Sequence, residues 1–360
     1  MKFLDLFAGI GGFRLGMESA GHECIGFCEI DKFARASYKA IHDTEGEIEL
    51  HDITRVTDES VRGFGSVDII CGGFPCQAFS IAGARRGFED TRGTLFFEIC
   101  RFASILRPKY IFLENVRGLL NHDGGATFET IIRTLDGLGY DVEWQILNSK
   151  NFGVPQNRER VFIVGHLRGE RTRNVFPISG ESQSTSSQSV IKIGNVNPSG
   201  NGMNGEVYQA DGLAPTLTTN KGEGQKIAVK SNTIKHFGVL QPNFNQCGVI
   251  YETDGIAPTI RAYQGGGLEP KIIQRGHGYN KGGEHDIAPT LTSNSYHENN
   301  HLSDSFRIRK LTPRECWRLQ GFPDWDFDKA QEVNSNSQLY KQAGNSVTVS
   351  VIAVIAKELE

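Results

Sequence analysis

Residues 72–80 have the sequence Gly-Gly-Phe-Pro-Cys-Gln-Ala-Phe-Ser, and they follow the apolar run Val-Asp-Ile-Ile-Cys at residues 67–71. The length and β-branched content of that run predict a buried strand. A cysteine after such a strand lies at the carboxyl ends of the strands, where α/β proteins place reactive groups. Pro75 fixes its own φ and restricts Phe74, so the Cys76 thiol has a defined direction. A buried, inert thiol is the alternative, because free cysteines are commonly buried.

Predicted strands and helices alternate through the first half of the chain. A strand at residues 2–7 precedes a tight glycine turn and a helix at residues 13–20; the glycines of the turn are Gly9, Gly11 and Gly12. A strand, a glycine turn and a helix are typical of a nucleotide-binding corner, although many such turns only connect two elements. A second strand at residues 24–28 ends at Glu29, where an acid can accept hydrogen bonds from ribose hydroxyls. The pattern predicts a doubly wound, Rossmann-like α/β domain.

Two further strand ends carry charged residues. The apolar run at residues 110–113 ends in Glu114, which places a carboxylate in the same crevice as Cys76, unless it only caps a helix. Arg158 and Arg160 precede the apolar run at residues 161–167. Alternate residues of a strand point to the same side, so both arginines are expected to face the crevice, with surface salt bridges as the alternative.

Composition excludes several classes of protein. The net charge of −4 argues against a protein that coats polyanions, but a local basic channel for DNA remains compatible with it. Seven cysteines without dense, paired spacing favour a reducing compartment, and we expect the cytoplasm. Cys24 and Cys28 lack a second pair of ligands, so no metal is expected. No apolar run approaches the roughly 18 residues of a membrane span, and the first residues predict a strand and not a signal peptide.

The second half of the chain has a different character. A Ser/Gln tract at residues 182–189 has no apolar period and predicts a linker. Beyond it, an Ala-Pro-Thr unit occurs three times at uneven spacing, within residues 211–217, 254–260 and 286–291. Short strands joined by glycine loops predict a smaller, irregular, β-rich domain. We therefore expect one domain at residues 1–172 plus 323–360, a linker at 173–190 and a second domain at 191–322.

Six blocks of the sequence resemble, in order, the motifs of the bacterial and phage-type DNA (cytosine-5)-methyltransferases. The blocks are residues 5–12 (DLFAGIGG), 72–80 (GGFPCQAFS), 114–116 (ENV), 156–160 (QNRER), 309–316 (RKLTPREC) and 342–347 (QAGNSV). One block could match by chance, but six in order and covering both ends of the chain could not. The resemblance implies a Rossmann-like methyltransferase domain that binds S-adenosylmethionine and a β-rich target-recognition domain.

The resemblance also implies a set of cofactor-binding residues. Phe7 would pack on the adenine, Glu29 would bind the ribose and Asp52 would accept from the adenine amino group, although Asp52 could be a plain turn aspartate. Leu95 would line the pocket, with core packing as the alternative. The remaining matched positions are Gly9, Gly11, Gly12, Ile30, Asn345 and Ser346.

The implied reaction explains the catalytic motifs. Cytosine C5 is a poor nucleophile, and addition of the Cys76 thiolate at C6 activates it. A protonated Glu114 would stabilise N3, while Arg158 and Arg160 would orient the ring carbonyl and a flanking phosphate. The cytosine would have to be extruded from the duplex to reach these groups.

DNA contacts are expected from a loop and from the second domain. The glycine-flanked loop after Cys76 resembles a lid that closes over DNA, with Gln77, Ser80, Arg85 and Arg86 as its contacts. The middle repeated unit most resembles the target reader, which assigns Gln246 to the space left by the base and places Thr259 and Tyr263 near it. A repeated hairpin without a reading role is the alternative. Whether the three units give one specificity or several stays open.

The expected partner is double-stranded DNA, and a restriction endonuclease could act on the same site without forming a stable complex. We expect a monomer that does not bind membranes. An RNA cytosine C5-methyltransferase shares most of these motifs, but its cysteine block usually carries Pro-Pro-Cys, where this chain has Phe74 before Pro75. A non-catalytic, cofactor-binding DNA regulator is a further alternative, although it would need no nucleophile.

Overall fold

The computed structural model describes most of the first half of the chain, its C-terminal fifth and separate segments between them. The described residues are 1–75, 95–180, 189–195, 206–210, 212–217, 226–230, 236–239, 249–251, 272–274, 283–285, 300–301 and 306–359. The chain forms two compact units. Unit 1 comprises Met1–Val190, Asp211–Gly224 and Leu311–Glu360, and unit 2 comprises Ile191–Ala210 and Gln225–Lys310.

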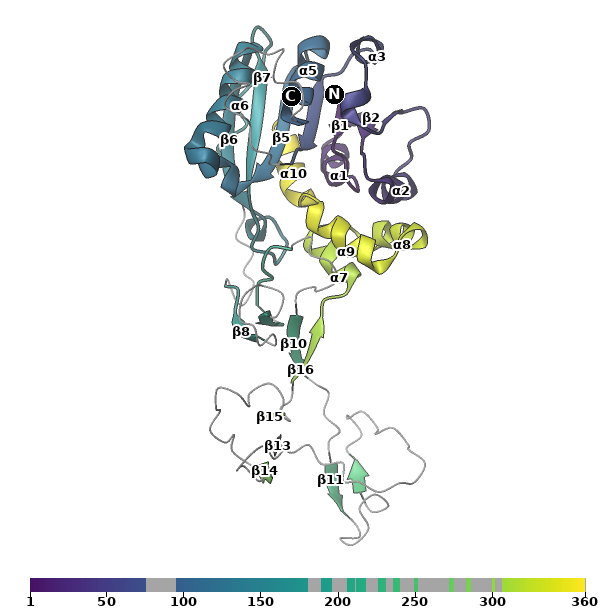
Figure 1. Cartoon of the computed structure of the whole chain (residues 1–360), viewed down its shortest axis with the longest axis vertical. Helices are drawn as coiled ribbons and strands as arrows, with labels where there is room; N and C mark the ends of the chain where they lie inside the picture. The colour runs from purple at the N-terminus through teal and green to yellow at the C-terminus, as the bar shows by residue number, and fades with distance from the viewer. Residues whose placement is uncertain are drawn as a thin grey trace. The chain divides into compact units, whose positions relative to one another are not determined.

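A seven-stranded sheet forms the centre of unit 1 (Figure 1). Its strands lie in the order β3-β2-β1-β4-β5-β7-β6. Strands β1 to β5 are mutually parallel, and β7 runs antiparallel to both of its neighbours. The strands are β1 (Lys2–Leu6), β2 (Glu23–Cys28), β3 (Ile48–Leu50), β4 (Ile69–Gly73), β5 (Tyr110–Val116), β6 (Tyr140–Asn148) and β7 (Glu159–Leu167). The strand order reverses between β1 and β4, and a doubly wound sheet opens its binding crevice at this point. The predicted α/β fold is confirmed.

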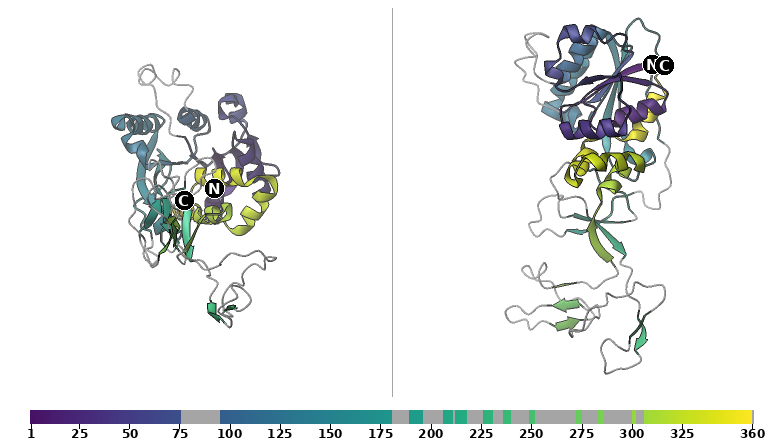
Figure 2. Two further views of the ribbon diagram at one scale, coloured as in Figure 1. Left: turned by 60° about the horizontal axis from the view of Figure 1, so that its bottom comes forward. Right: turned by 90° about the vertical axis from the view of Figure 1, so that its right-hand side faces the viewer.

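Helices cover both faces of this sheet because side chains alternate along each strand. Phe3 of β1 packs with α1 (Gly12–Ser19) and α10 (Val349–Ala356) on one face. Leu4 packs on the other face, in a cluster with side chains of α3 (Asp58–Arg62), α5 (Leu95–Leu106) and α6 (Ala126–Gly137). Helices α1 and α10 approach so closely that a Cβ on Gly16 would lie 2.5 Å from Ile352. The last helix therefore packs beside the first strand–helix unit, and the two termini lie side by side (Figures 1 and 2).

The remaining helices of unit 1 are α2 and three helices after residue 311. Their bounds are α2 (Lys32–Ile41), α7 (Pro313–Leu319), α8 (Asp324–Val333) and α9 (Asn336–Asn345), and three short 3-10 turns are η1 (Ile53–Arg55), η2 (Arg117–Gly125) and η3 (Ser149–Asn151). Thr312 and Glu315 form a capping box at the start of α7. Residues 311–322, which the sequence boundary placed in the second domain, lie in unit 1 because the fully buried Trp317 packs on Phe322 and Phe327. In the described part of the chain, none of the helices has the length and apolar character needed to cross a bilayer.

The described strands of unit 2 are short and form three small sheets. The four-stranded sheet has the order β16 (Phe306–Lys310), β10 (Lys226–Lys230), β9 (Glu206–Gln209) and β8 (Lys192–Asn195). Strands β11 (His236–Val239) and β12 (Val249–Tyr251) form a pair, and β13 (Ile272–Gln274) lies between β14 (Gly283–His285) and β15 (Asn300–His301). The expected smaller, irregular β-rich domain is confirmed. The described residues 212–217 of the connection between β9 and β10 do not belong to it, because they lie in unit 1.

Candidate active site

A cavity of about 670 Å³ lies in unit 1 at the carboxyl ends of the parallel strands. Its volume is in the range of sites for cofactors and drug-sized ligands. Seven of the predicted site residues line it: Phe7, Gly9, Glu29, Glu114, Arg158, Arg160 and Asn345. The predicted cofactor and base-binding groups therefore share one cavity, although they come from widely separated parts of the sequence.

The glycine turn after β1 forms one wall of this cavity. Phe7 has a left-handed backbone with φ of 57°, which costs energy for a residue with a side chain and is found mainly at functional sites. The turn also needs glycine at position 11, where φ is 88° and a Cβ would lie 2.0 Å from Nε2 of His42. Burial lowers the pKa of His42 to about 3, so a neutral imidazole packs beneath the turn and lies 3.3 Å from the carbonyl oxygen of Ile10. The His42 ring thus occupies the space that a side chain at position 11 would need.

Glu29 lies at the end of β2 and faces the same turn. Its Oε2 accepts from the Gly9 amide at 2.8 Å and its Oε1 accepts from the Asp31 amide at 2.7 Å. Burial raises the pKa of Glu29, although these two amides oppose the shift. Arg35 holds the acidic turn from the other side by donating to the carbonyl oxygens of Glu29 and Ile30 at 2.8 and 3.0 Å. A fixed acid beside a glycine turn fits the ribose of S-adenosylmethionine.

Asp31, two residues after Glu29, caps the N-terminus of α2. Its side chain accepts from the amides of Phe33 and Ala34 at the start of α2. The same carboxylate pairs with Lys341 of α9 at 2.6 Å, and both residues line the cavity. This ion pair ties the acidic turn to the helix that leads into Asn345.

Six predicted cofactor residues lie off the cavity wall: Gly11, Gly12, Ile30, Asp52, Leu95 and Ser346. Ile30 is 69% exposed. The Asp52 carboxylate accepts from the amide and the hydroxyl of Thr54 and caps η1, in keeping with a turn aspartate. Leu95 packs against the hydrophobic core, as its alternative reading expected. Contacts from these six residues to the cofactor remain predictions.

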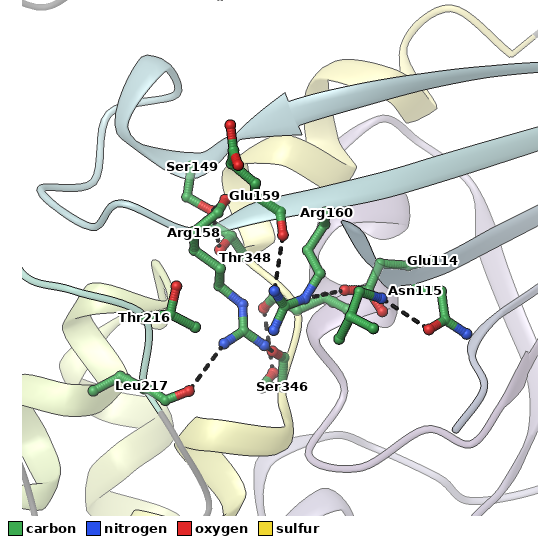
Figure 3. A network of polar contacts seen from close by, with 12 residues as sticks. Glu114, Asn115, Ser149, Arg158, Glu159, Arg160, Thr216, Leu217, Ser346 and Thr348 are labelled. Carbon is green, nitrogen blue, oxygen red and sulfur yellow. Dashed lines mark hydrogen bonds and ion pairs between the residues drawn. The ribbon is translucent and has the colours of Figure 1, made fainter. Parts of the chain in front are cut away.

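Glu114 and Arg160 form an ion pair on the cavity wall (Figure 3). Glu114 of β5 and Arg160 of β7 come from adjacent antiparallel strands, and Arg160 Nε lies 2.9 Å from Glu114 Oε1. Burial raises the pKa of Glu114, while the charges of Arg160 and Arg158 oppose the shift. A Cβ at Gly73 would lie 3.0 Å from Glu114 Oε2, so the small residue lets β4 end close to the carboxylate. This geometry suits a carboxyl group that holds a proton in a dry site.

Asn115 fixes the turn that leads to the predicted nucleophile. Its Nδ2 donates to the carbonyl oxygen of Phe74 at 2.9 Å, and Asn115, Phe74 and Pro75 line the cavity. Cys76 follows Pro75 directly in the sequence but lies outside the described residues. The other predicted residues outside them are Gln77, Ser80, Arg85, Arg86, Gln246, Thr259 and Tyr263.

Arg158 and Arg160 both line the cavity, as their alternation predicted, but their partners differ. The Arg158 guanidinium donates to the main-chain oxygens of Ser346, Gly344 and Leu217 at 2.7, 3.2 and 3.4 Å (Figure 3). Only 2% of Arg158 is exposed. Burial and the charge of Arg160 lower the pKa of Arg158 to about 9, while Glu114 opposes the shift. Arg158 therefore binds protein carbonyls, whereas Arg160 binds the carboxylate.

Sequence reasoning missed Thr216 and Leu217, which line the same cavity. They belong to the first repeated unit, whereas the middle unit was assigned to the reader. A Thr-Leu pair could not have singled out the first unit, because residues 290–291 of the third unit are also Thr-Leu. Residues 216–217 are Thr-Leu, whereas residues 259–260 are Thr-Ile.

Metal chemistry has no support from the residues that the structure covers. No three His, Cys, Asp or Glu side chains converge there as metal ligands. The five cysteines in those ranges are free and buried. Burial raises the pKa of each of their thiols, so they are poor candidates for the nucleophile.

Comparison with known proteins identifies the family of this chain. The orphan methyltransferase M.SPRI of Bacillus phage SPR is 35% identical over 433 residues, with 100% of this chain and 97% of the relative covered. The type II methyltransferase M.HpaII of Haemophilus parainfluenzae is 39% identical over 362 residues, with 99% and 88% covered. The solved structure of the Entamoeba histolytica methyltransferase EhMeth has the same fold, with a TM-score of 0.60 at 18% identity over 99% of this chain and 97% of that one. The methyl donor of such enzymes is S-adenosylmethionine. The family model for C-5 cytosine-specific DNA methylase matches residues 1–360, and this chain belongs to that family of DNA methyltransferases.

Proposed function

We propose that this DNA cytosine methyltransferase modifies C5 within a specific duplex sequence, through a covalent bond between Cys76 Sγ and C6 of an extruded cytosine. One observation carries the proposal: the buried pair of Glu114 and Arg160 shares a cavity with Phe7 and Glu29. Pro75, the residue before Cys76, lies on the wall of the same cavity. A nucleophile, an acid and a cofactor site would thus meet at one strand-end crevice.

The chemistry assigns a separate task to each side chain. The Cys76 thiolate adds to C6, and the electron pair displaced towards N3 is met by a proton from Glu114. Arg160 Nε holds the Glu114 carboxyl group at 2.9 Å, and its guanidinium would orient the ring carbonyl. Arg158 adds positive charge near the thiolate, which would lower the pKa of Cys76.

Adduct formation makes C5 nucleophilic, and S-adenosylmethionine supplies the methyl group when it is bound. Loss of the C5 proton to a base and rupture of the bond between sulfur and C6 then release Cys76 as a thiolate. Return of the N3 proton to Glu114 restores the neutral aromatic ring. Phe7, Gly9, Glu29 and Asn345 would hold the cofactor, because they line one part of the cavity. Contacts from Gly11, Gly12, Ile30, Asp52, Leu95 and Ser346 would complete that site.

Extruding the cytosine costs a few kcal/mol, which contacts to DNA must offset. We assign this task to the loop residues Gln77, Ser80, Arg85 and Arg86 and to the reader residues Gln246, Thr259 and Tyr263. In this division unit 1 is catalytic and unit 2 recognises the target. Residues 173–180 of the expected linker pack in unit 1 instead, because Val175 is buried in its core and the amides of Val175 and Ile178 donate to Glu143 Oε1 and Gln145 Oε1 at 2.6 and 2.8 Å.

The relatives suggest a biological setting. The names of the matched proteins describe an orphan methyltransferase of a phage and a type II methyltransferase of a bacterium. We propose that this enzyme protects DNA from restriction, as a cytoplasmic monomer without a stable endonuclease complex. Light scattering would test the monomer, and a restriction challenge of DNA from expressing cells would test protection.

The reaction is tested by methyl transfer from labelled S-adenosylmethionine to duplex DNA of mixed sequence, with total RNA in parallel. We expect labelled DNA, with methylcytosines at a defined sequence, and no label with Cys76→Ser. Labelled RNA alone would assign the enzyme to the RNA-modifying alternative. Transfer to neither, despite cofactor binding, would favour the regulator.

The covalent step needs its own test, because methyl transfer alone does not reveal an adduct. DNA containing 5-fluorocytosine at the mapped target should trap the enzyme, since fluorine cannot leave C5 as a proton does. We expect a protein–DNA complex that survives denaturation with the unaltered enzyme and none with Cys76→Ser. A trapped complex with the serine variant would exclude Cys76 as the nucleophile.

A further inference from the structure

The connection between β9 and β10 is bound to the loop that carries the arginine motif. The amide of Asn157 donates to the Ala214 carbonyl at 2.8 Å, and the amide of Ala214 donates to the Pro155 carbonyl at 2.8 Å. The Thr216 hydroxyl donates to the Asn157 carbonyl at 2.8 Å. Strands β9 and β10 at the ends of this connection are parallel neighbours in unit 2. Residues 212–217 are therefore fixed in unit 1 although they join two strands of unit 2.

Arg158 links this connection to the segment around Asn345 (Figure 3). Its Nη1 donates to Leu217 O at 3.4 Å, and its Nη2 donates to Gly344 O at 3.2 Å and to Ser346 O at 2.7 Å. Gly344, Asn345 and Leu217 line the cavity. One guanidinium thus holds both a candidate cofactor segment and a segment continuous with the candidate reader.

We propose that Arg158 is a positioning residue that couples cofactor binding to the reader connection, and through it to DNA binding. The inference rests on the proposed function for the identity of the two ligands. A guanidinium is planar and rigid. If the carbonyls of Gly344 and Ser346 move, the guanidinium must move with them, and its bond to the Leu217 carbonyl changes as well. The site is buried, which strengthens hydrogen bonds between a cation and a carbonyl.

Lysine or methionine at position 158 cannot reproduce this link. Lysine has one compact ammonium group, which cannot reach both carbonyl sets in the forked geometry. Methionine has no donor, so the oxygens of Ser346 and Leu217 would each lose the bond from residue 158. The three hydrogen bonds between residues 155–157 and 214–216 do not involve the Arg158 side chain. These substitutions therefore test the guanidinium separately from the other contacts between the two segments.

Hydrogen exchange tests the coupling without DNA and without turnover. The Ala214 amide reports the connection, because it donates to Pro155 O, and the Ser346 amide reports the cofactor segment, because it donates to Gln342 O. In the unaltered protein, S-adenosylhomocysteine should slow exchange at Ser346 and also at Ala214, by about five-fold or more. In Arg158→Met the slowing should remain at Ser346 and disappear at Ala214.

Thr216→Val is the matched control. It removes the hydroxyl bond to Asn157 from the same connection but leaves the guanidinium in place. Exchange at Ala214 should become faster in this variant, while S-adenosylhomocysteine should still slow it. If Arg158→Met does not fold by circular dichroism, Arg158→Lys takes its place, with the same expected loss.

Two results would overturn the proposal: no slowing at Ala214 in the unaltered protein, or slowing that persists in the folded Arg158 variants. No slowing at Ser346 would instead refute the cofactor site, and the coupling with it.

A second experiment uses duplex DNA containing the mapped target. It should tighten S-adenosylhomocysteine binding about five-fold or more in the unaltered protein, and not in Arg158→Met. An equal effect of DNA in both proteins would also refute the coupling.

Discussion

Replacing Asp5 by asparagine should make the stability of unit 1 less dependent on pH. Asp5 lies in β1 at the centre of the sheet and is fully buried. Burial raises the pKa of Asp5 from 3.8 to about 8, although Arg14 and the Tyr38 hydroxyl partly oppose the shift. Between these two pKa values the folded chain holds a proton that the unfolded chain has lost. The free energy of unfolding must therefore fall as the pH rises from about 4 to about 8.

The size of this effect follows from the pKa difference. One pH unit within the window changes the free energy of unfolding by about 1.4 kcal/mol when one full proton distinguishes the two states. Between pH 5.5 and 7.5, Asp5→Asn should therefore gain about 2–3 kcal/mol relative to the unaltered protein. The buried amide adds an unsatisfied donor, which costs about 1–3 kcal/mol at every pH and so does not alter the slope.

Urea denaturation followed by tryptophan fluorescence measures the stability of unit 1 selectively. The three tryptophans, Trp144, Trp317 and Trp325, all belong to this unit. The two proteins are compared at pH 5.5, 6.5 and 7.5, and the difference between their free energies of unfolding is plotted against pH. Asp43→Asn, at an exposed position, serves as the control and should retain the pH profile of the unaltered protein.

Parallel pH profiles for Asp5→Asn and the unaltered protein would refute the reasoning. They would mean that Asp5 binds no extra proton in the folded state. Burial would then not raise the pKa of this carboxyl group. A profile that diverges in the opposite direction, with Asp5→Asn losing relative stability as the pH rises, would show a lowered pKa.

Three further outcomes are expected from the described contacts. Glu114→Gln should slow single-turnover methyl transfer by about 10²–10⁴-fold, because an amide cannot deliver the proton to the base. Glu159→Gln, at a half-buried position that does not line the cavity, should retain the rate, and an equal loss in both variants would exclude a specific role for Glu114. Arg35→Ala should weaken binding of S-adenosylhomocysteine about ten-fold in calorimetry, since it frees two carbonyls of the acidic turn, at about 1–1.5 kcal/mol for the pair. Arg35 also approaches Glu49, which pairs with Lys39. Lys39→Ala breaks only the pair with Glu49 and should bind S-adenosylhomocysteine normally; equal weakening would assign the effect to Glu49 instead. Thr312→Ala should destabilise unit 1 by about 1 kcal/mol in urea through loss of the helix cap, and an unchanged midpoint would contradict this.

Most strands and helices of unit 1 could be predicted because their apolar patterns are clear, but their ends depended on neighbouring strands. The strand before Cys76 was predicted at residues 67–71, whereas β4 spans Ile69–Gly73. Glycines are unfavourable in strands, yet a Cβ on Gly72 would lie 2.1 Å from Leu6 O, so close pairing with β1 requires glycine there. Helix α8 was not predicted, because its N-cap is Pro323 and no side chain caps it.

The candidate site was predictable only in part. Sequence patterns indicate to which side of the sheet a side chain points, but they do not give its burial or its partners. Strand ends placed Glu29 and Glu114 correctly on the cavity wall. Alternation predicted that Arg158 and Arg160 share a side, but it could not distinguish the arginine that binds carbonyls from the one that binds Glu114. The three repeated units carry nearly the same local sequence, so only the contacts of residues 214–217 with residues 155–158 reveal that the first unit reaches the cavity.

The path of the chain between β9 and β10 limits how the specificity of this enzyme can be engineered. A designer who exchanges residues 191–310 as one cassette would also remove residues 212–217, of which Thr216 and Leu217 line the cavity. The graft would then need two inserts, at residues 191–210 and 225–310, with the native peptide kept between them. The donor domain would not need a Thr-Leu pair of its own, because this enzyme keeps its own peptide with Thr216 and Leu217.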